Sequence, residues 1–297
     1  MSAGGVLCAG RLYCDLVFTG LDRLPTLGTE TFADGLGLYA GGGAFITAAY
    51  LAALGRPASL AATLPADPFR ALVQADLARF GVGADLCRAA PEGSDPQITV
   101  AMTTAQDRAF LTRASGPALP RLGPDQMAAP GLRHLHIGEL RTLADNPWLL
   151  EVARKAGLSV SLDCGWEDDL PDKAGALIAG VDLFLPNDAE AQRFLDQGIA
   201  LGGPMLTVIK RGAAGAVALK GTDQWEAAGH PARTVDTTGA GDAFNGGFLD
   251  RWLAGAPVPD CLEAGNRCGA AAVAAVGGTG GISGLRDARP VPVASGV

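Results

Sequence analysis

The chain alternates between the hydrophobic patterns of strands and of helices. Six short apolar runs have the length and composition of buried strands, at 4–10, 59–64, 134–137, 159–163, 182–185 and 205–209. Helical patterns lie between several of them, at 44–54, 67–80, 147–156 and 189–195. This alternation predicts an α/β fold with a central, mostly parallel sheet flanked by helices on both faces.

Two segments interrupt the alternation with antiparallel β patterns. Residues 12–39 are rich in aromatic residues, Thr and Gly, and residues 97–114 hold two strand-like runs around a polar turn at 105–107. We expect segments of about 13–38 and 94–115 to form a small β-sheet lid. The lid would be inserted in the α/β core of a single domain that spans 1–297.

Composition narrows the class of partner. A hydrophobic fraction of 48% and a charged fraction of 18% suit a globular protein with a large core. The chain has 42 glycines, and some of them form short clusters at 41–43, 239–247 and 277–281, which suggests tight turns near a ligand. The net charge of −8 argues against a nucleic-acid or anionic-membrane partner, since both need a basic surface.

The same sequence gives expectations about location. The first residues lack a basic start followed by an apolar core, and no apolar run is long enough to span a bilayer. The six cysteines show neither a CxxC pair nor the spacing of a metal site. We therefore expect free thiols in a reducing cytoplasm.

Ligands of open α/β sheets bind at the carboxyl ends of the strands. Applied to the glycine clusters and acidic residues, this rule points to 41–43, Glu139, Asp163, 187–190, 210–215 and 236–242. These positions are therefore the first candidates for a site.

The strongest chemical signal is the segment 236–242, Asp-Thr-Thr-Gly-Ala-Gly-Asp, which precedes an apolar helical stretch. Unpaired N–H groups and the helix dipole favour an anion at such a helix start, and Gly239 and Gly241 let it approach the backbone. Asp242 could accept a proton from a substrate hydroxyl in the same turn. A phosphate cradle beside a carboxylate base suits phosphoryl transfer to an alcohol. A plain helix cap is the alternative.

The stretch DTTGAGDAFNGGF, residues 236–248, resembles the C-terminal signature of the PfkB, or ribokinase-like, carbohydrate kinases, whose core is D-T-x-G-A-G-D-x-F. The resemblance implies an ATP-dependent kinase with an α/β core and a β lid, which forms a homodimer interface in several members. It implies that Asp242 is the general base. It also implies that the backbone amides of Gly239, Ala240 and Gly241 form an anion hole.

Further segments match the family on the acceptor side. Gly41, Gly42 and Gly43 resemble the N-terminal glycine signature, which lets the backbone approach the substrate. Asp15 corresponds to the family's sugar-binding aspartate, and Glu139 corresponds in position to a substrate-contacting acid. The resemblance therefore implies substrate contacts at all five positions.

The nucleotide side has its own matches. Asn187 and Glu190 fit the family's N-x-x-E motif, which organises Mg²⁺ through water, although their spacing is also that of a capping box. Lys210, Gly212 and Gly215 resemble the nucleotide loop; Lys210 or Arg211 would meet phosphate or remain solvated.

The C-terminal part completes the expected nucleotide site. Asn266 and the glycines at 277–281 fall where the family shapes the adenine and ribose pocket. Many members bind K⁺ near the DTTGAGD segment, and Asp236 is the candidate here. The sequence has no Walker A pattern, so phosphate binding must rest on the anion hole and the metal.

The chain also departs from the family. Ile46 stands where many members have an Asn that contacts a sugar hydroxyl, and a ribose hydroxyl left unpaired there would cost about 1–3 kcal/mol. Residues 163–166, Asp-Cys-Gly-Trp, replace the D-x-N-x-R motif of several sugar kinases. These changes argue against ribose bound as in ribokinase. His134 and His136 alternate along one strand and are expected to be structural.

The function predicted from the sequence is ATP-dependent phosphorylation of a hydroxyl of a sugar or sugar derivative. A nucleoside kinase of the same fold is the alternative, and an aromatic residue of the lid stacking on a base would favour it; the candidates are Phe18, Phe32 and Phe110. A catalytically silent sugar sensor would need a defect at Asp242 or in the anion hole, and none is seen.

Overall fold

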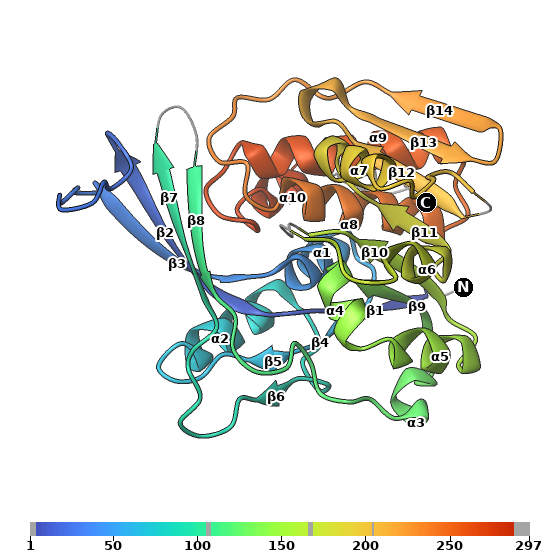
Figure 1. The fold of residues 1–297 in the computed structure, drawn as a ribbon, viewed down its shortest axis with the longest axis horizontal. Coiled ribbons are helices and arrows are strands. Elements are labelled where there is room, and N and C mark those ends of the chain that lie inside the picture. Colours follow the sequence, from blue (N-terminus) through green and yellow to red (C-terminus); the bar gives the residue numbers. More distant parts are fainter. Residues whose placement is uncertain (1–3, 105–107, 166–168, 204, 288–297) are drawn as a thin grey trace, which may run out of the picture.

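The computed structural model describes residues 4–104, 108–165, 169–203 and 205–287. Its centre is an eight-stranded sheet in the order β14-β13-β12-β11-β10-β9-β1-β4 (Figure 1). In that order the strands are Asp223–Ala227, Ala216–Lys220, Leu206–Lys210, Leu183–Leu185, Ser159–Asp163, Leu132–Ile137, Gly5–Ala9 and Ala58–Ala61. All neighbouring strands from β12 to β4 are parallel, whereas β13 pairs antiparallel with both β12 and β14. The predicted mostly parallel sheet is confirmed.

Helices cover both faces of this sheet. One face packs against α1 (Gly43–Ala53), α2 (Arg70–Phe80), α8 (Ala240–Leu253), α9 (Val258–Val273) and α10 (Ile282–Asp287). The other packs against α3 (Pro124–Met127), α4 (Leu140–Asp145), α5 (Trp148–Lys155), α6 (Ala174–Ala179) and α7 (Asp188–Asp196). Successive residues of a strand therefore point to opposite faces of the sheet. Val6 packs in the core on the α1 side, and Leu7 packs in the core on the α5 side.

A second, four-stranded sheet projects from one side of the core (Figure 1). Its order is β3 (Gly35–Gly41), β2 (Tyr13–Leu21), β7 (Ile98–Thr104) and β8 (Arg108–Arg113). The outer pairs are antiparallel, whereas β2 and β7 are parallel. The two β segments expected from the sequence thus join in one small sheet; the polar turn expected at 105–107 lies outside the described residues.

Two predicted elements differ clearly from the structure. The single strand expected at 59–64 is wrong: β4 ends at Ala61, and β5 (Thr63–Leu64) pairs with β6 (Arg88–Ala89) in a separate sheet. An apolar run does not reveal that the chain changes partner within it. The helix expected from residue 67 begins at Arg70, after a turn in which the Phe69 N–H donates to the Ala66 carbonyl.

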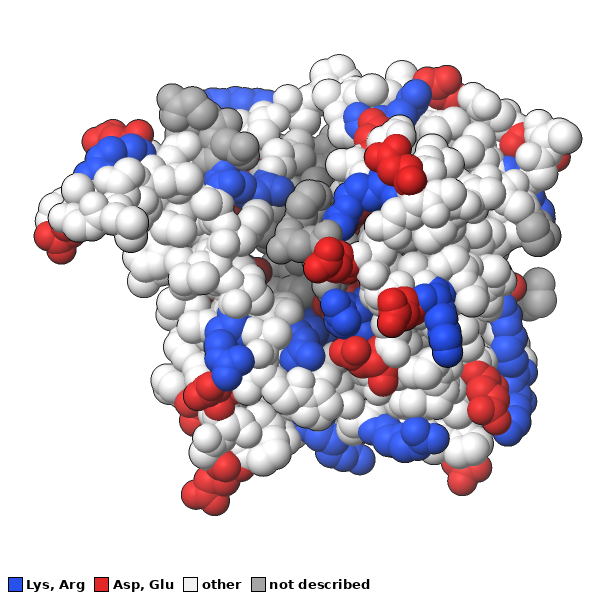
Figure 2. Space-filling model, in the orientation of Figure 1, with Lys and Arg blue, Asp and Glu red and all other residues white. Residues whose placement is uncertain are grey.

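The surface is hollowed between the small sheet and the core (Figure 2). Acidic and basic side chains are interspersed over this face of the molecule. Within the described ranges, no helix is both long enough and apolar enough to cross a membrane.

Candidate active site

Asp242 lies in the first turn of α8, where that helix approaches α1. The buried Thr47 hydroxyl of α1 donates to the Asp242 carbonyl oxygen over 3.1 Å and so joins the two helices at this turn. A Cβ atom on Gly43 would lie 2.7 Å from Asp242 Oδ1, so glycine is needed for the carboxylate to lie against the 41–43 segment. Thr47 was not identified from the sequence; a polar residue in an otherwise apolar helix was the available signal.

The carboxylate of Asp242 is in an unfavourable environment for a negative charge. Removal from water raises its pKa to about 7, and the nearby Asp163 adds to this rise. Lys210 acts in the opposite direction and lowers the pKa. Asp242 therefore gains and loses its proton near neutral pH, which suits a general base.

The residues 239–242, which we call the anion loop, begin α8. Gly239 has a φ of 72°, and a Cβ atom on it would lie 2.7 Å from Gly278 Cα and 3.0 Å from Ile46 Cδ1. Ile46 therefore packs beneath the loop. The Ala240 N–H donates to the Thr237 carbonyl over 3.3 Å. The N–H groups of the first helical turn beyond it have no partner within the helix and can bind an anion.

Asp15 and Glu139, the two acidic residues expected on the acceptor side, have different surroundings. Asp15 lies on β2, buried against Gly41, where any Cβ would collide with its carboxylate. Burial raises the pKa of Asp15 to about 7; a hydrogen bond from Thr99 opposes the rise. Glu139 follows β9 and accepts a hydrogen bond of 2.6 Å from the Thr142 hydroxyl.

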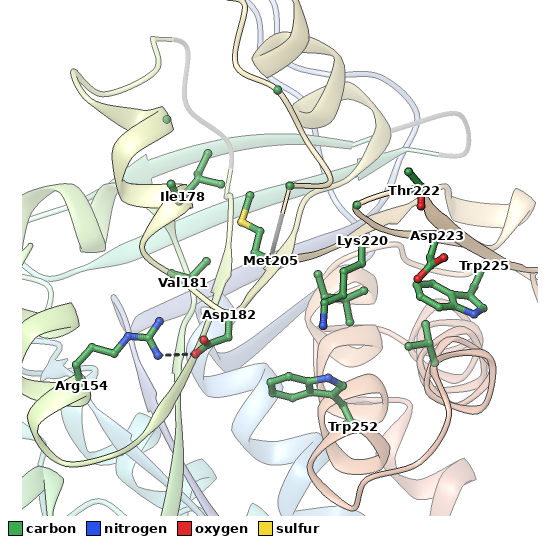
Figure 3. A pocket seen from close by; sticks show the side chains of 17 residues that line it. Arg154, Ile178, Val181, Asp182, Met205, Lys220, Thr222, Asp223, Trp225 and Trp252 are labelled. Atoms are coloured by element: carbon green, nitrogen blue, oxygen red, sulfur yellow. Dashed lines mark hydrogen bonds and ion pairs between the residues drawn. The ribbon is translucent and has the colours of Figure 1, made fainter.

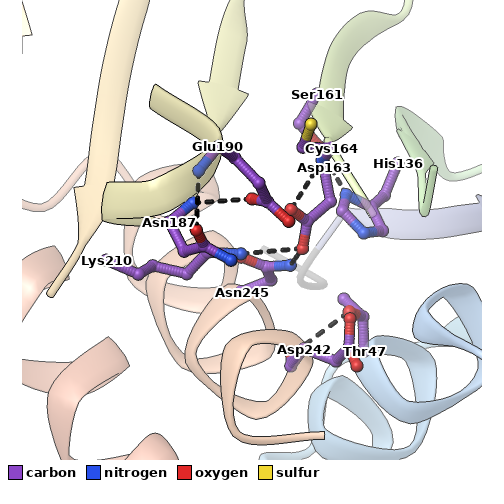
Figure 4. A network of polar contacts seen from close by, with 10 residues as sticks. All are labelled: Thr47, His136, Ser161, Asp163, Cys164, Asn187, Glu190, Lys210, Asp242 and Asn245. Carbon is purple, nitrogen blue, oxygen red and sulfur yellow. Dashed lines mark hydrogen bonds and ion pairs between the residues drawn. The ribbon is translucent and has the colours of Figure 1, made fainter. Parts of the chain in front are cut away.

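A buried polar network lies beside the anion loop (Figure 4). Lys210, the last residue of β12, donates to Asp163 Oδ2 over 2.8 Å and to Asn245 Oδ1 over 3.3 Å. Asn245 in turn donates to the same oxygen of Asp163. The solvated alternative for Lys210 is therefore wrong, because Asp163 at the end of β10 pairs with it inside the protein. The role of Asn245 was missed, although it lies three residues after Asp242.

Asn187 and Glu190 form a capping box at the start of α7. The Glu190 N–H donates to Asn187 Oδ1 over 2.9 Å, and the Asn187 N–H donates to Glu190 Oε2 over 2.7 Å. Burial, and next Asp163, raise the pKa of Glu190 to about 7. The capping alternative is thus realised, and it leaves the second oxygen of this buried carboxylate for another role.

The nucleotide-loop candidates line one wall of the same pocket. Gly212 begins a short 3₁₀ turn after β12 and Gly215 follows it, where any Cβ would collide with the Ala227 carbonyl. Asn266 of α9 donates to the Ala227 and Ala228 carbonyls over 3.2 and 3.0 Å and so fixes the end of β14. The neighbouring cation Arg211 forms an ion pair with Glu226.

Asp236 connects the start of this segment with the glycine-rich stretch at 277–281. Its carboxylate accepts hydrogen bonds from the Thr238 N–H (2.9 Å), the Thr238 hydroxyl (2.7 Å) and the Gly277 N–H (2.9 Å). Arg108 of β8 comes within 4.0 Å of it. Asp236 therefore holds two loops together beside the site.

The two histidines of β9 have structural surroundings. His134 contacts the hydroxyls of Ser159 and Ser161, and His136 contacts Ser161, all within 2.7–2.8 Å. Both rings are fully buried, and burial lowers the pKa of His136 to about 4. They are therefore neutral at physiological pH, as the structural interpretation expects.

A single cavity of about 910 Å³ collects most of these groups. The predicted residues that line it are Gly43, Glu139, Asn187, Glu190, Lys210, Gly212, Gly215, Gly239, Ala240, Gly241, Asp242 and Asn266. Asp15, Gly41, Gly42 and Asp236 lie behind or beside its wall. Arg108 also lines the cavity and was not identified from the sequence. Of the replaced motif, Asp163 and Gly165 line it, and Trp166 lies outside the described residues.

A larger hollow of about 1160 Å³ lies near the amino ends of β11 and β12 (Figure 3). Trp225, Trp252 and Met205 face it, together with the ion pair of Arg154 and Asp182. None of the predicted site residues lines it. The predicted site residues therefore converge on the smaller cavity, at the carboxyl ends of the parallel strands.

Fold and site together define a phosphotransferase built on a parallel α/β sheet, and comparisons with known proteins agree. The model of the pfkB family carbohydrate kinases matches residues 32–283. The chain therefore belongs to the PfkB family of carbohydrate kinases, which are ATP-dependent.

Individual relatives cover nearly the whole chain. An ATP-dependent ribose-1-phosphate kinase from Halopiger xanaduensis is 29% identical over 98% of this chain and 96% of its own length. Ribokinase from Arabidopsis thaliana, solved with ribose and ATP, superposes with a TM-score of 0.77 at 20% identity, covering 94% of this chain and 95% of that one. A nucleoside kinase from Methanocaldococcus jannaschii gives 0.75 at 18% identity, covering 94% of each. The expected ribokinase-like fold is confirmed.

Proposed function

We propose that this kinase transfers the γ-phosphoryl group of ATP to a hydroxyl of a sugar derivative, with Asp242 as the base. The observation that carries this assignment is the convergence of a carboxylate, an anion loop and a cation in one cavity. Asp242 lies in the first turn of α8, the 41–43 segment lies against its carboxylate, and Lys210 lies against Gly241.

The geometry supports a simple division of roles. The acceptor hydroxyl lies beside Asp242, which takes its proton as the oxygen attacks the γ-phosphorus. The bond between that phosphorus and the β,γ-bridging oxygen breaks, and ADP leaves with the electron pair. The amides of the anion loop stabilise the negative charge on the transferred group. Asp15 and Glu139 hold the other acceptor hydroxyls.

The residues of the cavity fit Mg²⁺ held mainly through water. Within the described ranges no group of three or more His, Cys, Asp or Glu side chains is arranged to bind a metal. Glu190 nevertheless lines the cavity, and one of its carboxylate oxygens takes no part in the capping box. Mg²⁺ accepts such sparse protein ligation, because it retains waters and binds phosphates. When bound with ATP, it would neutralise phosphate charge, with Asn187 and Glu190 as its supports. For K⁺, Asp236 stays our candidate.

The inner face of the small sheet indicates an anionic acceptor. The strand register places Arg108 and Phe110 of β8 on the same face as Asp15 of β2. The guanidinium of Arg108 lies over the Phe110 ring, 5.2 Å from its centre, and lines the cavity. We infer that Arg108 contacts an acidic group of the acceptor, such as a phosphate; the Halopiger relative is named for a sugar phosphate.

A nucleoside acceptor receives less support from the aromatic candidates. Phe18 lies on the opposite, outer face of the small sheet, and Phe32 is 79% exposed in a loop. Phe110 is on the inner face, where the guanidinium of Arg108 lies over its ring. None of the three lines the cavity.

We further propose that residues 1–297 form one kinase domain and that the small sheet acts as its lid. The outer face of this sheet exposes Leu36, Leu38 and Leu111, which the register places on one side. Such an exposed apolar face suits a homodimer in which the outer faces of two lids pack against each other. The six cysteines are free and buried, which supports a reducing cytoplasm.

The acceptor can be found by measuring ADP release with Mg²⁺ and ATP over ketoses, aldoses, sugar acids, sugar phosphates and nucleosides. We expect turnover with a sugar phosphate or sugar acid. Arg108→Met should then raise KM for that acceptor far more than KM for ATP, because the proposed substrate contact of the guanidinium is with the acceptor. Turnover restricted to nucleosides would contradict the proposed acceptor class.

A further inference from the structure

The network of Asp163, Lys210 and Asn245 brings together three elements that are distant in the sequence. Asp163 ends β10, Lys210 ends β12, and Asn245 lies in α8 one turn after Asp242. Figure 4 shows the three side chains pointing toward one another beside the start of α8. All three are buried.

The hydrogen bonds of the network fix the direction of every group. Asp163 Oδ2 accepts from both Lys210 Nζ and Asn245 Nδ2, and Asn245 Oδ1 accepts from Lys210 Nζ. The reverse orientation of the amide would set its oxygen against a carboxylate and its NH₂ group against an ammonium. An ammonium carries three N–H donors, and the described residues accept two of them. One donor therefore remains for a ligand.

The ammonium lies directly against the anion loop. A Cβ atom built on Gly241 would lie 3.3 Å from Lys210 Nζ, so the ammonium lies close to the backbone of this glycine. Lys210 and Gly241 both line the cavity. An anion bound by the N–H groups of this turn would therefore also reach the ammonium.

Lys210 is a cation in a cavity that is lined by several carboxylates. Glu139, Asp163, Glu190 and Asp242 all line the cavity that Lys210 enters. Burial disfavours the charge of Lys210, but Asp163 and Glu190 outweigh it and raise the pKa of the ammonium. The carboxylates would repel a triphosphate, whereas a fixed ammonium beside the loop offsets part of that repulsion.

Resting on the proposed function, we propose that Lys210 contacts the phosphoryl group in transfer, and that Asp163 and Asn245 are positioning residues that hold its ammonium beside Gly241. Lys210 keeps its protons throughout and supplies only fixed charge and one hydrogen bond. It thereby shares with the loop amides the charge that develops on the phosphoryl oxygens.

A purely structural role explains the network less well. A buried ion pair contributes little net stability, because desolvation of both charges offsets their attraction. Apolar residues of similar size would fill the same space without that cost. The arrangement has a clear use only if a ligand meets the ammonium.

The test compares nucleotide binding by Lys210→Met and by the double variant Lys210→Met/Asp163→Asn. The double variant removes both charges, so it guards against unfolding caused by an unpaired carboxylate. Calorimetry with Mg²⁺ should show about a tenfold or larger loss of affinity for the ATP analogue AMP-PNP, with ADP affinity retained, because only AMP-PNP carries a γ-phosphoryl group. With the acceptor identified, kcat should fall about 10²–10³-fold in both variants.

Lys155→Met, which removes an exposed lysine paired with Glu151, is the matched control and should change neither affinity. An equal loss for both nucleotides, no loss for either, or recovery of turnover when Asp163→Asn is added to Lys210→Met would overturn the proposal. The binding comparison needs no acceptor. A wild-type protein without turnover would therefore contradict the proposed function while still deciding the role of Lys210.

Discussion

At the scale of single residues, the site concentrates carboxylates whose charge the fold tolerates poorly. Burial and Asp163 raise the pKa of Asp242 to about 7. The reference value of an aspartate is about 3.9, so the folded state binds this proton more tightly than the unfolded chain. Ionisation of Asp242 therefore lowers the free energy of unfolding progressively as the pH rises from about 4 to 7, and the full decrease persists above pH 7.

Asp242→Asn should therefore be more stable than the wild-type protein. We expect its melting temperature to exceed that of the wild type at pH 8 and the difference to shrink toward pH 4. Thermal unfolding followed by circular dichroism over this pH range measures the effect. A difference that is constant with pH would show that Asp242 does not titrate in this window.

The same titration should control turnover. The base works only when ionised, so kcat/KM should fall as the pH decreases below about 7, and the plateau should lie above it. Initial rates with the identified acceptor give this profile. Rates that are flat from pH 5 to 8 would contradict the assignment of the base.

The sequence predicted residues whose role is local, and it missed those whose role depends on distant partners. Asp242 and Glu190 lie in contiguous patterns, so their candidate roles could be named before the fold was known. Asn245 acts through Asp163, 82 positions away, and Thr47 through the Asp242 carbonyl, 195 positions away. No pattern along the chain reports such contacts.

At the scale of elements, the two glycines that flank α8 allow backbone strain to be distinguished from steric contact. Gly239 before the helix and Gly255 after it have φ angles of 72° and 76°. A side chain costs about 1–2 kcal/mol in this region. Around Gly255 no atom lies within 4 Å of a built Cβ, whereas at Gly239 the Cβ would press on Gly278 and Ile46.

Gly255→Ala should consequently lower the melting temperature by a few degrees and leave kcat unchanged. Gly239→Ala should lower it further and abolish most turnover, because the anion loop must move away from Gly278. Thermal unfolding and initial rates of the two variants distinguish the effect of backbone strain, which both share, from displacement of the anion loop, which only Gly239→Ala causes. Equal activity in both variants would show that the loop geometry is not needed.

Elements with a clear period were found from the sequence, whereas changes of partner were not. The helix expected at 44–54 corresponds to α1, and the strand expected at 159–163 corresponds to β10. The apolar run 59–64 predicts one strand, yet it is divided between two sheets, because residues 63 and 64 pair with β6. Hydrophobicity reports burial and gives no information about which strand provides the hydrogen bonds.

At the scale of the whole molecule, the exposed outer face of the small sheet predicts association. Leu111 is 67% exposed and lies in register with Val100, Leu16 and Leu38 on that face. We expect a dimer by light scattering after size-exclusion chromatography, and Leu111→Asp should convert it to a monomer. Leu195→Asp, on α7 and 50% exposed, is the matched control and should leave the dimer intact. A monomeric wild-type protein would contradict the lid interface.

The central claim is that Asp242 is the base of a phosphoryl transfer from ATP to an acceptor hydroxyl. The most direct measurement is the rate of ADP release and of phosphorylated acceptor formation, by mass spectrometry, for the wild type and for Asp242→Asn. Asp260→Asn, an exposed aspartate on α9, serves as the control. The account predicts stoichiometric ADP and product for the wild type and the control, with a loss of about 10²–10⁴-fold in Asp242→Asn. Turnover by Asp242→Asn at the wild-type rate would contradict it.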